Sequence, residues 1–379
     1  MSPKVLYFCI LFNYSVELFV LGFVPIKSKI VRYTAAITHT IVCIVVHQNS
    51  LQTGNEIYDS SIAINFGSLL ALRMIYHFLL LPKTFVGKDN SFGKRIRYAN
   101  SIIWNARMIG TPEKVKNVPE WRSGGKPTKL KFLCYKAVWF SISYLIADAL
   151  TFNVTPEEVR EKVQVWCAQE HEWLLRLPTL EEFTIRMFLT IMYATMATVS
   201  ANLILQTMDI IVVGLGLVDV ENCRPQFGSI SESYTVRRFW SMFWHQNLQQ
   251  MVTTYSALLT RLLPIKNSLF QRYFKIITAF AISGAMHELA NIVTGPHSFQ
   301  LKCTIFFMLS GFAIMMEDFV QHIYMSTKKA GSKTGSAWYE RLIGYCWVVL
   351  FFTWATPLWS FTLSRDSTGT YFPIRFINS

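Results

Sequence analysis

Apolar residues in this chain occur in long runs rather than in the alternating patterns of a soluble fold. A run of about 18 or more apolar residues is typical of a transmembrane helix. We expect spanning helices at residues 4–25, 33–49, 61–82, 130–152, 184–217, 273–294, 302–324 and 342–363. The fifth run is too long for one bilayer crossing at about 1.5 Å per residue. It is tilted, extends past the membrane, or splits near Asp209.

Two segments do not fit this pattern. Residues 251–264 are apolar but too short to span, which predicts a re-entrant or interfacial helix ending at Pro264, with a cytosolic amphipathic helix as the alternative. Residues 83–129 are predicted to be a long loop because they carry turn signals such as Gly110-Thr111-Pro112. The predicted fold class is therefore all-α. We expect a multi-pass integral membrane helical bundle of about eight spanning helices plus the short helix, forming a single domain over residues 1–379.

Composition and charge support the membrane assignment. The chain is 52% hydrophobic and only 16% charged, whereas a soluble domain is about a quarter charged. Its net charge of +13 comes from basic residues gathered in particular loops, such as Lys27, Lys29 and Arg32. Basic and acidic loops alternate, so the positive-inside rule places the basic loops and His245 on the cytoplasmic side and both termini in the lumen. Membrane lipids are expected partners and nucleic acids are not, because no nucleic-acid-binding motif is present.

Two histidines are the main candidates for chemistry. His245 ends the aromatic block 239–245 and follows the basic pair Arg237 and Arg238, while His287 lies in the apolar segment 276–287. A histidine at bilayer depth is unfavourable by roughly a few kcal/mol and is a functional-site hypothesis by default. Burial favours the neutral imidazole, which is the form that acts as a general base. The alternatives are a hydrogen-bonded structural histidine at 287 and a chance histidine in an interfacial aromatic belt at 245.

The sequence lacks the motifs of metal sites, disulfide frameworks, nucleophilic catalysis and nucleotide binding. His287-Glu288 has no second histidine at the HExxH spacing, and the seven cysteines show no metal-type spacing, so neither a metal site nor a disulfide framework is expected. No nucleophile elbow, P-loop or GxGxxG occurs, so neither ATP nor NAD is expected as a cofactor. Two other classes stay open, a lipid-scaffold protein and a secondary transporter. The transporter interpretation depends on the intramembrane acids Glu17, Asp148, Asp209, Glu317 and Asp318.

The two histidine segments together resemble a known family. The run 238–246 (RFWSMFWHQ) is similar to a block of the wax-synthase-like branch of membrane-bound O-acyltransferases, and 283–288 (SGAMHE) is similar to the superfamily's Ser-Gly-x-x-His element. The run 225–228 (PQFG) also fits this family, and the run 104–119, from Trp104 to Pro119, resembles fungal members that acetylate terpenoids and meroterpenoids. The similarity extends over roughly residues 60 to 360. In the sterol and diacylglycerol branches an asparagine takes the place of His245.

The resemblance implies acyl transfer from acyl-CoA to an alcohol inside a membrane-embedded tunnel. His287 would accept the hydroxyl proton, and His245 would donate a hydrogen bond to the thioester carbonyl or orient the donor. Arg237, Arg238 and Trp244 are the candidate acyl-CoA-binding residues. The expected cosubstrate is acetyl-CoA, with no permanently bound cofactor, and the expected acceptor is a hydrophobic terpenoid or meroterpenoid alcohol. A long-chain wax-ester synthase is the alternative, and the endoplasmic reticulum is the expected location.

Overall fold

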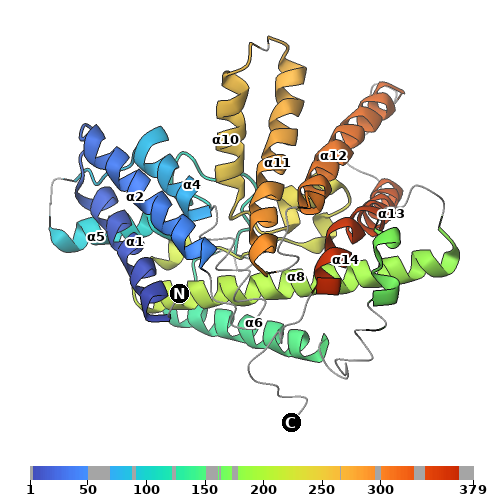
Figure 1. Cartoon of the computed structure of the whole chain (residues 1–379), viewed down its shortest axis with the longest axis horizontal. Helices are drawn as coiled ribbons and strands as arrows, with labels where there is room; N and C mark the ends of the chain where they lie inside the picture. The colour runs from blue at the N-terminus through green and yellow to red at the C-terminus, as the bar shows by residue number, and fades with distance from the viewer. Residues whose placement is uncertain are drawn as a thin grey trace.

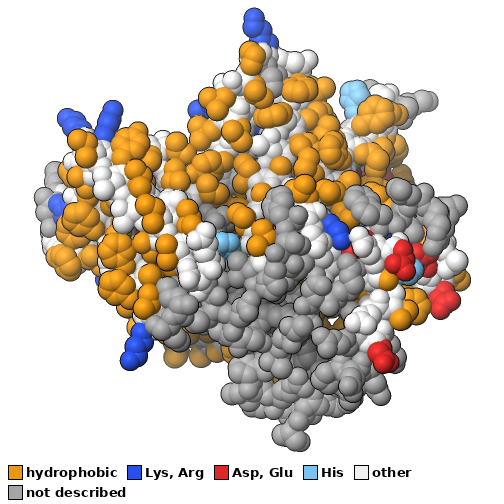
Figure 2. Space-filling view, viewed as in Figure 1, with side chains coloured by type: hydrophobic (Ala, Val, Ile, Leu, Met, Phe, Trp, Pro, Cys, Tyr) orange, Lys and Arg blue, Asp and Glu red, His pale blue; other side chains and the backbone are white. Residues whose placement is uncertain are grey.

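The computed structural model describes residues 3–49, 69–87, 91–121, 125–150, 161, 164–172, 178–264, 266–294, 300–327 and 338–366. Over these ranges all regular secondary structure is helical, which confirms the predicted all-α class. Helices α6 (Lys129–Leu150) and α8 (Leu180–Gly214) run side by side along one edge of the molecule, and α10 (Gln249–Arg261) and α11 (Ser268–Thr294) form a projecting pair (Figure 1). One face of the molecule is covered largely by hydrophobic side chains (Figure 2).

Five of the described helices are long and apolar enough to cross a membrane. They are α1 (Pro3–Phe23), α2 (Lys29–Gln48), α6, α8 and α12 (Lys302–Thr327). Helices α13 (Trp338–Ala355) and α14 (Pro357–Asp366) make a sixth span if the bent pair is one crossing. The protein is therefore an integral membrane protein, and the number of eight spans stays a prediction. The span predicted at 342–363 corresponds to this pair of helices, which bends by 46° where Pro357 interrupts the helix, so a single crossing there stays a prediction.

The structure shows how the long apolar run predicted at 184–217 folds. Helix α8 is one continuous helix of 35 residues and does not split at Asp209. Asp209 binds the buried Lys136 of α6 at 2.6 Å, so its charge is paired without breaking the helix. Helix α11 confirms that residues 273–294 are helical, but it is not among the five helices that are long and apolar enough to cross a membrane, so its crossing stays a prediction. Its apolar sequence is interrupted by His287, Glu288 and Asn291.

Two further segments, 61–82 and 83–129, differ from their predicted structure. The predicted helix at 61–82 is seen as α4 (Leu70–Ile75) followed by the π-helix η2 (Tyr76–Leu80), and residues 61–68 lie outside the described residues. The loop predicted at 83–129 contains a helix, α5 (Phe92–Ile103), so that part of the prediction is wrong. Ala99, Ile102 and Ile103 are buried in the core with α1. Their i, i+3, i+4 spacing was the helical signal.

Helices α11 and α12 pack closely enough to exclude a side chain at Gly284. A Cβ at this position would lie 2.6 Å from Cα of Thr304 on α12. Glu288, one turn along α11, is buried and accepts hydrogen bonds from the backbone N–H groups of Cys303 (3.1 Å) and Thr304 (3.3 Å). These are unpaired donors of the first turn of α12, where a carboxylate is favoured. The site therefore lies on a tightly joined helix pair.

We expect Gly284→Ala to destabilise the protein by about 1–3 kcal/mol, because the added methyl group must push α12 away from α11. The thermal unfolding midpoint of the detergent-solubilised protein measures this effect. Gly214→Ala, at the end of α8, is the matched control because nothing lies within 4 Å of its added Cβ. Equal midpoints for the two variants would show that the close approach of α11 and α12 does not limit stability.

Candidate active site

His287 points one ring nitrogen at its own helix. Its Nδ1 lies 2.7 Å from the carbonyl oxygen of Ser283. A carbonyl only accepts hydrogen bonds, so Nδ1 carries the proton and donates it, and Nε2 of the neutral ring keeps a free lone pair. The ring lies against that of Phe307 of α12 at a tilt of 32°, with 4.8 Å between centroids, and meets the edge of Trp359 at 5.5 Å. This arrangement presents Nε2 as a base within aromatic surroundings.

His245 follows a short and tightly held helical segment. The segment comprises the single turn α9 (Val236–Arg238) and the π-helix η6 (Phe239–Phe243). Glu317 of α12 accepts hydrogen bonds from the backbone N–H groups of Val236 (2.5 Å) and Arg237 (3.1 Å) and from the indole of Trp347 (2.8 Å). Helix α12 thus holds the start of the segment that ends at His245.

Gly228 lets the segment 225–228 pack directly against the backbone before His245. Its backbone N–H donates to the carbonyl oxygen of Phe243 at 2.9 Å. A Cβ at this position would lie 1.9 Å from the carbonyl oxygen of Met242, so a residue with a side chain does not fit here. Phe227 then meets the ring of His245 edge-on at 5.8 Å. Residues 225–228 therefore pack against the aromatic block 239–245, and this contact sets the position of His245.

The segment from Trp104 to Pro119 also contacts the site. Buried Arg107 donates to the carbonyl oxygens of Pro225 (2.7 Å) and Arg224 (2.8 Å). Gln246, next to His245, donates to the carbonyl oxygen of Asn117 at 2.9 Å. Asn117 has φ of 60°, a left-handed conformation that asparagine adopts more readily than most residues. This segment therefore supports both chain segments that flank His245.

A buried polar network, which the sequence did not predict, links α6 and α8 to the same region. Asp209 accepts from Nζ of Lys136 (2.6 Å) and from the side-chain amide of Gln226 (2.8 Å). Gln226 in turn accepts from the amide of Asn247 at 3.2 Å, two residues after His245. The only sequence signal was the isolated Asp209 and Lys136 in apolar runs, and their spacing along the chain gave no indication that they pair.

The structure brings the two predicted catalytic histidines together. Burial, with smaller contributions from the nearby His287 and Arg107, lowers the pKa of His245 to about 3. Both imidazoles nevertheless keep part of their surface accessible. Nδ1 of His245 and Nε1 of Trp240 are buried and have no hydrogen-bond partner among the described residues. Buried polar atoms are normally satisfied, so these two are candidates for binding a ligand.

Aromatic side chains fill the space between the two histidines. Trp240 lies 5.9 Å from Trp244, which precedes His245, and 5.4 Å from Phe307, which lies against His287. We call the following set the aromatic cluster: Trp240, Trp244, Phe280, Phe307, Phe352 and Trp359. It offers flat apolar surfaces and few polar atoms. The tunnel expected around it stays a prediction.

The predicted CoA-binding arginines bind carboxylates of the protein itself. Arg237 forms an ion pair with Asp318 at 2.6 Å. Arg238 forms an ion pair with Glu232 and also lies 4.4 Å above the ring of Tyr234. Arg238 is thus paired with a carboxylate of its own, whereas Arg237 shares Asp318 with Arg272, and the role of both arginines as phosphate ligands stays a prediction. Trp244 does lie beside the site, with its ring 5.2 Å from that of His245.

Four of the five intramembrane acids that suggested a transporter, Glu17, Asp209, Glu317 and Asp318, have local partners. Glu17 binds His39 at 2.7 Å, Asp209 binds Lys136, and Asp318 binds Arg237 and Arg272. Glu317 binds backbone N–H groups, as described above. These interactions connect neighbouring helices, which is a structural role. Among the described residues, no group of three or more His, Cys, Asp or Glu is placed to hold a metal ion.

Comparisons with known proteins agree with the geometry. Residues 223–310, which contain both histidines, match the model of the Membrane bound O-acyl transferase family. Acetyltransferase nanB of Aspergillus nanangensis is 27% identical over 374 residues, covering 93% of this chain and 88% of the relative. Acetyltransferase ataH of Aspergillus terreus is 29% identical over 277 residues (70% and 88%), and Acetyltransferase TRI7 of Fusarium sporotrichioides is 27% identical over 370 residues (87% and 82%).

The chain is therefore an acyltransferase. More particularly, it is similar to the membrane-bound O-acyltransferases and to fungal acetyltransferases, which confirms the resemblance found in its sequence motifs. An acyl donor and an acyl acceptor are its substrates, as this class of enzyme requires. The identities of both molecules, and the roles of the individual site residues, are matters of proposal.

Because the pKa of His245 is low, we expect the folded protein to lose stability at acidic pH. An unfolded histidine titrates near 6.5, whereas folded His245 titrates near 3. Between these values the unfolded state binds more protons, so stability falls as pH falls from about 6.5 towards 3. Unfolding midpoints measured in detergent between pH 7 and pH 4.5 should fall less for His245→Asn than for the unchanged protein. Parallel slopes for both proteins would contradict a neutral, buried His245.

Glu317 is predicted to position His245 without taking part in the chemistry. In Glu317→Gln one acceptor oxygen becomes an N–H₂ group that faces buried donors, which costs about 1–3 kcal/mol. We expect a lower unfolding midpoint and reduced turnover, with no change in the pH at which the remaining activity is half-maximal. Glu340→Gln is the control, because Glu340 makes an exposed hydrogen bond to Tyr324 at 2.7 Å. An altered pH profile in Glu317→Gln would instead indicate direct participation.

Proposed function

We propose that the protein transfers the acetyl group of acetyl-CoA to a hydroxyl group of a hydrophobic terpenoid or meroterpenoid in secondary-metabolite biosynthesis. The observation that carries the proposal is the free Nε2 of His287, whose other nitrogen is committed to Ser283, close to His245. An acetyl donor is favoured because the relatives over most of the chain are named acetyltransferases. The whole chain, 1–379, would act as one domain in the endoplasmic reticulum membrane.

His287 is the proposed general base. Nε2 accepts the proton of the acceptor hydroxyl while the oxygen attacks the thioester carbon, which forms a tetrahedral oxyanion. The C–S bond then breaks, and the departing sulfur takes the proton from the imidazolium to leave free CoA and the acetate ester. General-base catalysis contributes about 10²–10⁴-fold. The alcohol and thioester react directly when held in line, so an acyl-enzyme is not required.

His245 is the proposed hydrogen-bond donor to the oxyanion or the positioning residue for the thioester. Its low pKa keeps the ring neutral at physiological pH, so it donates one N–H and does not compete with His287 by carrying a charge. A donor directed at a developing oxyanion is worth about 3–4 kcal/mol. The asparagine found at this position in related branches also supplies an N–H donor, which fits a role in hydrogen bonding.

The aromatic cluster supports a flat, apolar acceptor. The rings of Phe307 and Trp359 lie directly against His287, so an acceptor positioned beside Nε2 meets aromatic surfaces rather than charges. Apolar surface removed from water contributes roughly 25 cal/mol per Å² to binding. A polycyclic alcohol that partitions into the bilayer matches this surface and carries a hydroxyl for His287.

We expect His287→Ala to lower turnover by about 10²–10⁴-fold, since the general base is lost. Labelled acetyl-CoA and a panel of polycyclic terpenoid alcohols, incubated with microsomes containing the protein, measure the transfer. His322→Ala is the matched control, because His322 is exposed near the end of α12 and away from the site. Undiminished transfer by folded His287→Ala would reject the assignment of the base.

Substitutions of His245 separate hydrogen bonding from proton transfer. If the residue donates a hydrogen bond, His245→Asn should keep more activity than His245→Ala, because the amide N–H replaces the ring N–H. The kcat of both variants in the same microsomal assay measures the difference. Equal loss in the two variants would instead show that the imidazole is needed for titration or for shape.

A further inference from the structure

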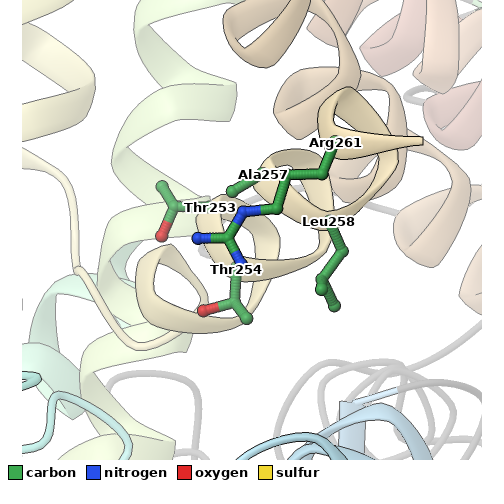
Figure 3. Close-up of a pocket in the computed structure, with 5 residues that line it drawn as sticks. All are labelled: Thr253, Thr254, Ala257, Leu258 and Arg261. Carbon is green, nitrogen blue, oxygen red and sulfur yellow. The ribbon is translucent and has the colours of Figure 1, made fainter. Parts of the chain in front are cut away.

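A hollow of about 270 Å³ lies along one face of α10 (Figure 3). Its lining residues are Thr253, Thr254, Ala257, Leu258 and Arg261. They recur at helical spacing and so form one continuous strip, which we call the α10 strip. None of them belongs to the aromatic cluster, and the function proposed above leaves the strip without a role.

The α10 strip leads from the catalytic residues towards the outer end of the α10–α11 pair. Helix α10 begins at Gln249, four residues after His245, and ends at Arg261. Its length is about 18 Å at a rise of about 1.5 Å per residue. This is comparable with the extended phosphopantetheine arm that separates the thioester of acyl-CoA from its pyrophosphate.

Arg261 supplies a positive charge that the protein does not neutralise itself. It is exposed and has no carboxylate partner among the described residues, in contrast to Arg237 and Arg238. Its side chain extends back along α10 over Ala257 towards Thr253 and Thr254 (Figure 3). Residues 249–275 contain no Asp or Glu, and basic side chains mark the outer end of the helix pair (Figure 2). An anion is therefore attracted to this end.

The two threonines are suited to the amide groups of a pantetheine arm. The hydroxyl of Thr253 donates to the carbonyl oxygen of Gln249 at 2.7 Å, and that of Thr254 donates to Gln250 at 2.8 Å. Each hydroxyl oxygen still has a lone pair that can accept from an amide N–H. Ala257 and Leu258 offer apolar contacts for the methylene groups between the amides. The strip thus offers two accepting hydroxyls, an apolar pair and a guanidinium carried by the residue at its outer end.

We propose that the α10 strip binds the phosphopantetheine and pyrophosphate of acyl-CoA, with Arg261 as the phosphate ligand and the thioester delivered at the His245 end. This assignment rests on the proposed function, since it presumes acyl-CoA as donor. Arginine suits the role because its planar guanidinium forms paired, charge-assisted hydrogen bonds to phosphate oxygens. It replaces Arg237 and Arg238 as the principal phosphate-binding site.

Kinetics with two donors test the assignment. For Arg261→Gln we expect the KM for acetyl-CoA to rise about tenfold or more, because a charge-assisted hydrogen bond is lost, while kcat stays within about twofold of the unchanged enzyme. With S-acetyl-pantetheine, which carries no phosphate, the two proteins should have equal kcat/KM. Arg261→Lys should recover part of the affinity. Lys29→Gln, which removes an exposed cation on α2, is the control and should leave both parameters unchanged.

Binding of desulfo-CoA to the purified protein in detergent tests the binding site on α10 and the identity of the acyl donor separately. If the unchanged protein binds desulfo-CoA and Arg261→Gln binds it equally well, the assignment of the α10 strip is overturned and the acyltransferase proposal stands. If the unchanged protein neither binds desulfo-CoA nor uses acetyl-CoA, the proposed donor itself is wrong and the assignment falls with it. A KM effect that persists with S-acetyl-pantetheine would also overturn a phosphate contact at Arg261.

Discussion

The geometry of the site depends on α12 being bound at two places by buried carboxylates. Near its start, α12 donates backbone N–H groups to Glu288, the neighbour of His287. Further along, Glu317 of α12 accepts N–H groups from the segment that leads to His245. Each carboxylate satisfies the unpaired donors of a helix start, where the helix dipole favours negative charge. One helix therefore fixes the relative positions of both histidines.

Close backbone packing makes this arrangement rigid. Gly284 lets α11 approach Thr304 of α12, and Gly228 lets the loop before the aromatic block approach Met242. Helix–helix contacts in membranes favour small residues for the same reason, since they allow backbones to pack closely. Within this frame Nδ1 of His245 and Nε1 of Trp240 are among the buried polar atoms that have no hydrogen-bond partner among the described residues, and both lie beside or within the aromatic cluster.

The sequence predicted the helical class, most of the long helices and the two histidines, because apolar runs and isolated polar residues within them are local signals. It missed α5, whose helical pattern at Ala99, Ile102 and Ile103 is short and lies in a charged segment. It also could not show that Arg237 binds Asp318, or that Lys136 binds Asp209. Those pairs join residues 81 and 73 positions apart, and only tertiary packing determines which charges meet. The same limit applies to Arg261, because only the tertiary structure shows that it has no carboxylate partner among the described residues.

The most direct measurement is an experimental structure of the protein bound to a non-reactive acetyl-CoA analogue. Our account predicts the acetyl carbonyl beside His245, its carbon near the open side of Nε2 of His287, and Nδ1 of His287 still bound to Ser283. An analogue bound away from both histidines, or Nε2 directed at lipid with no path to the bound donor, would contradict the account.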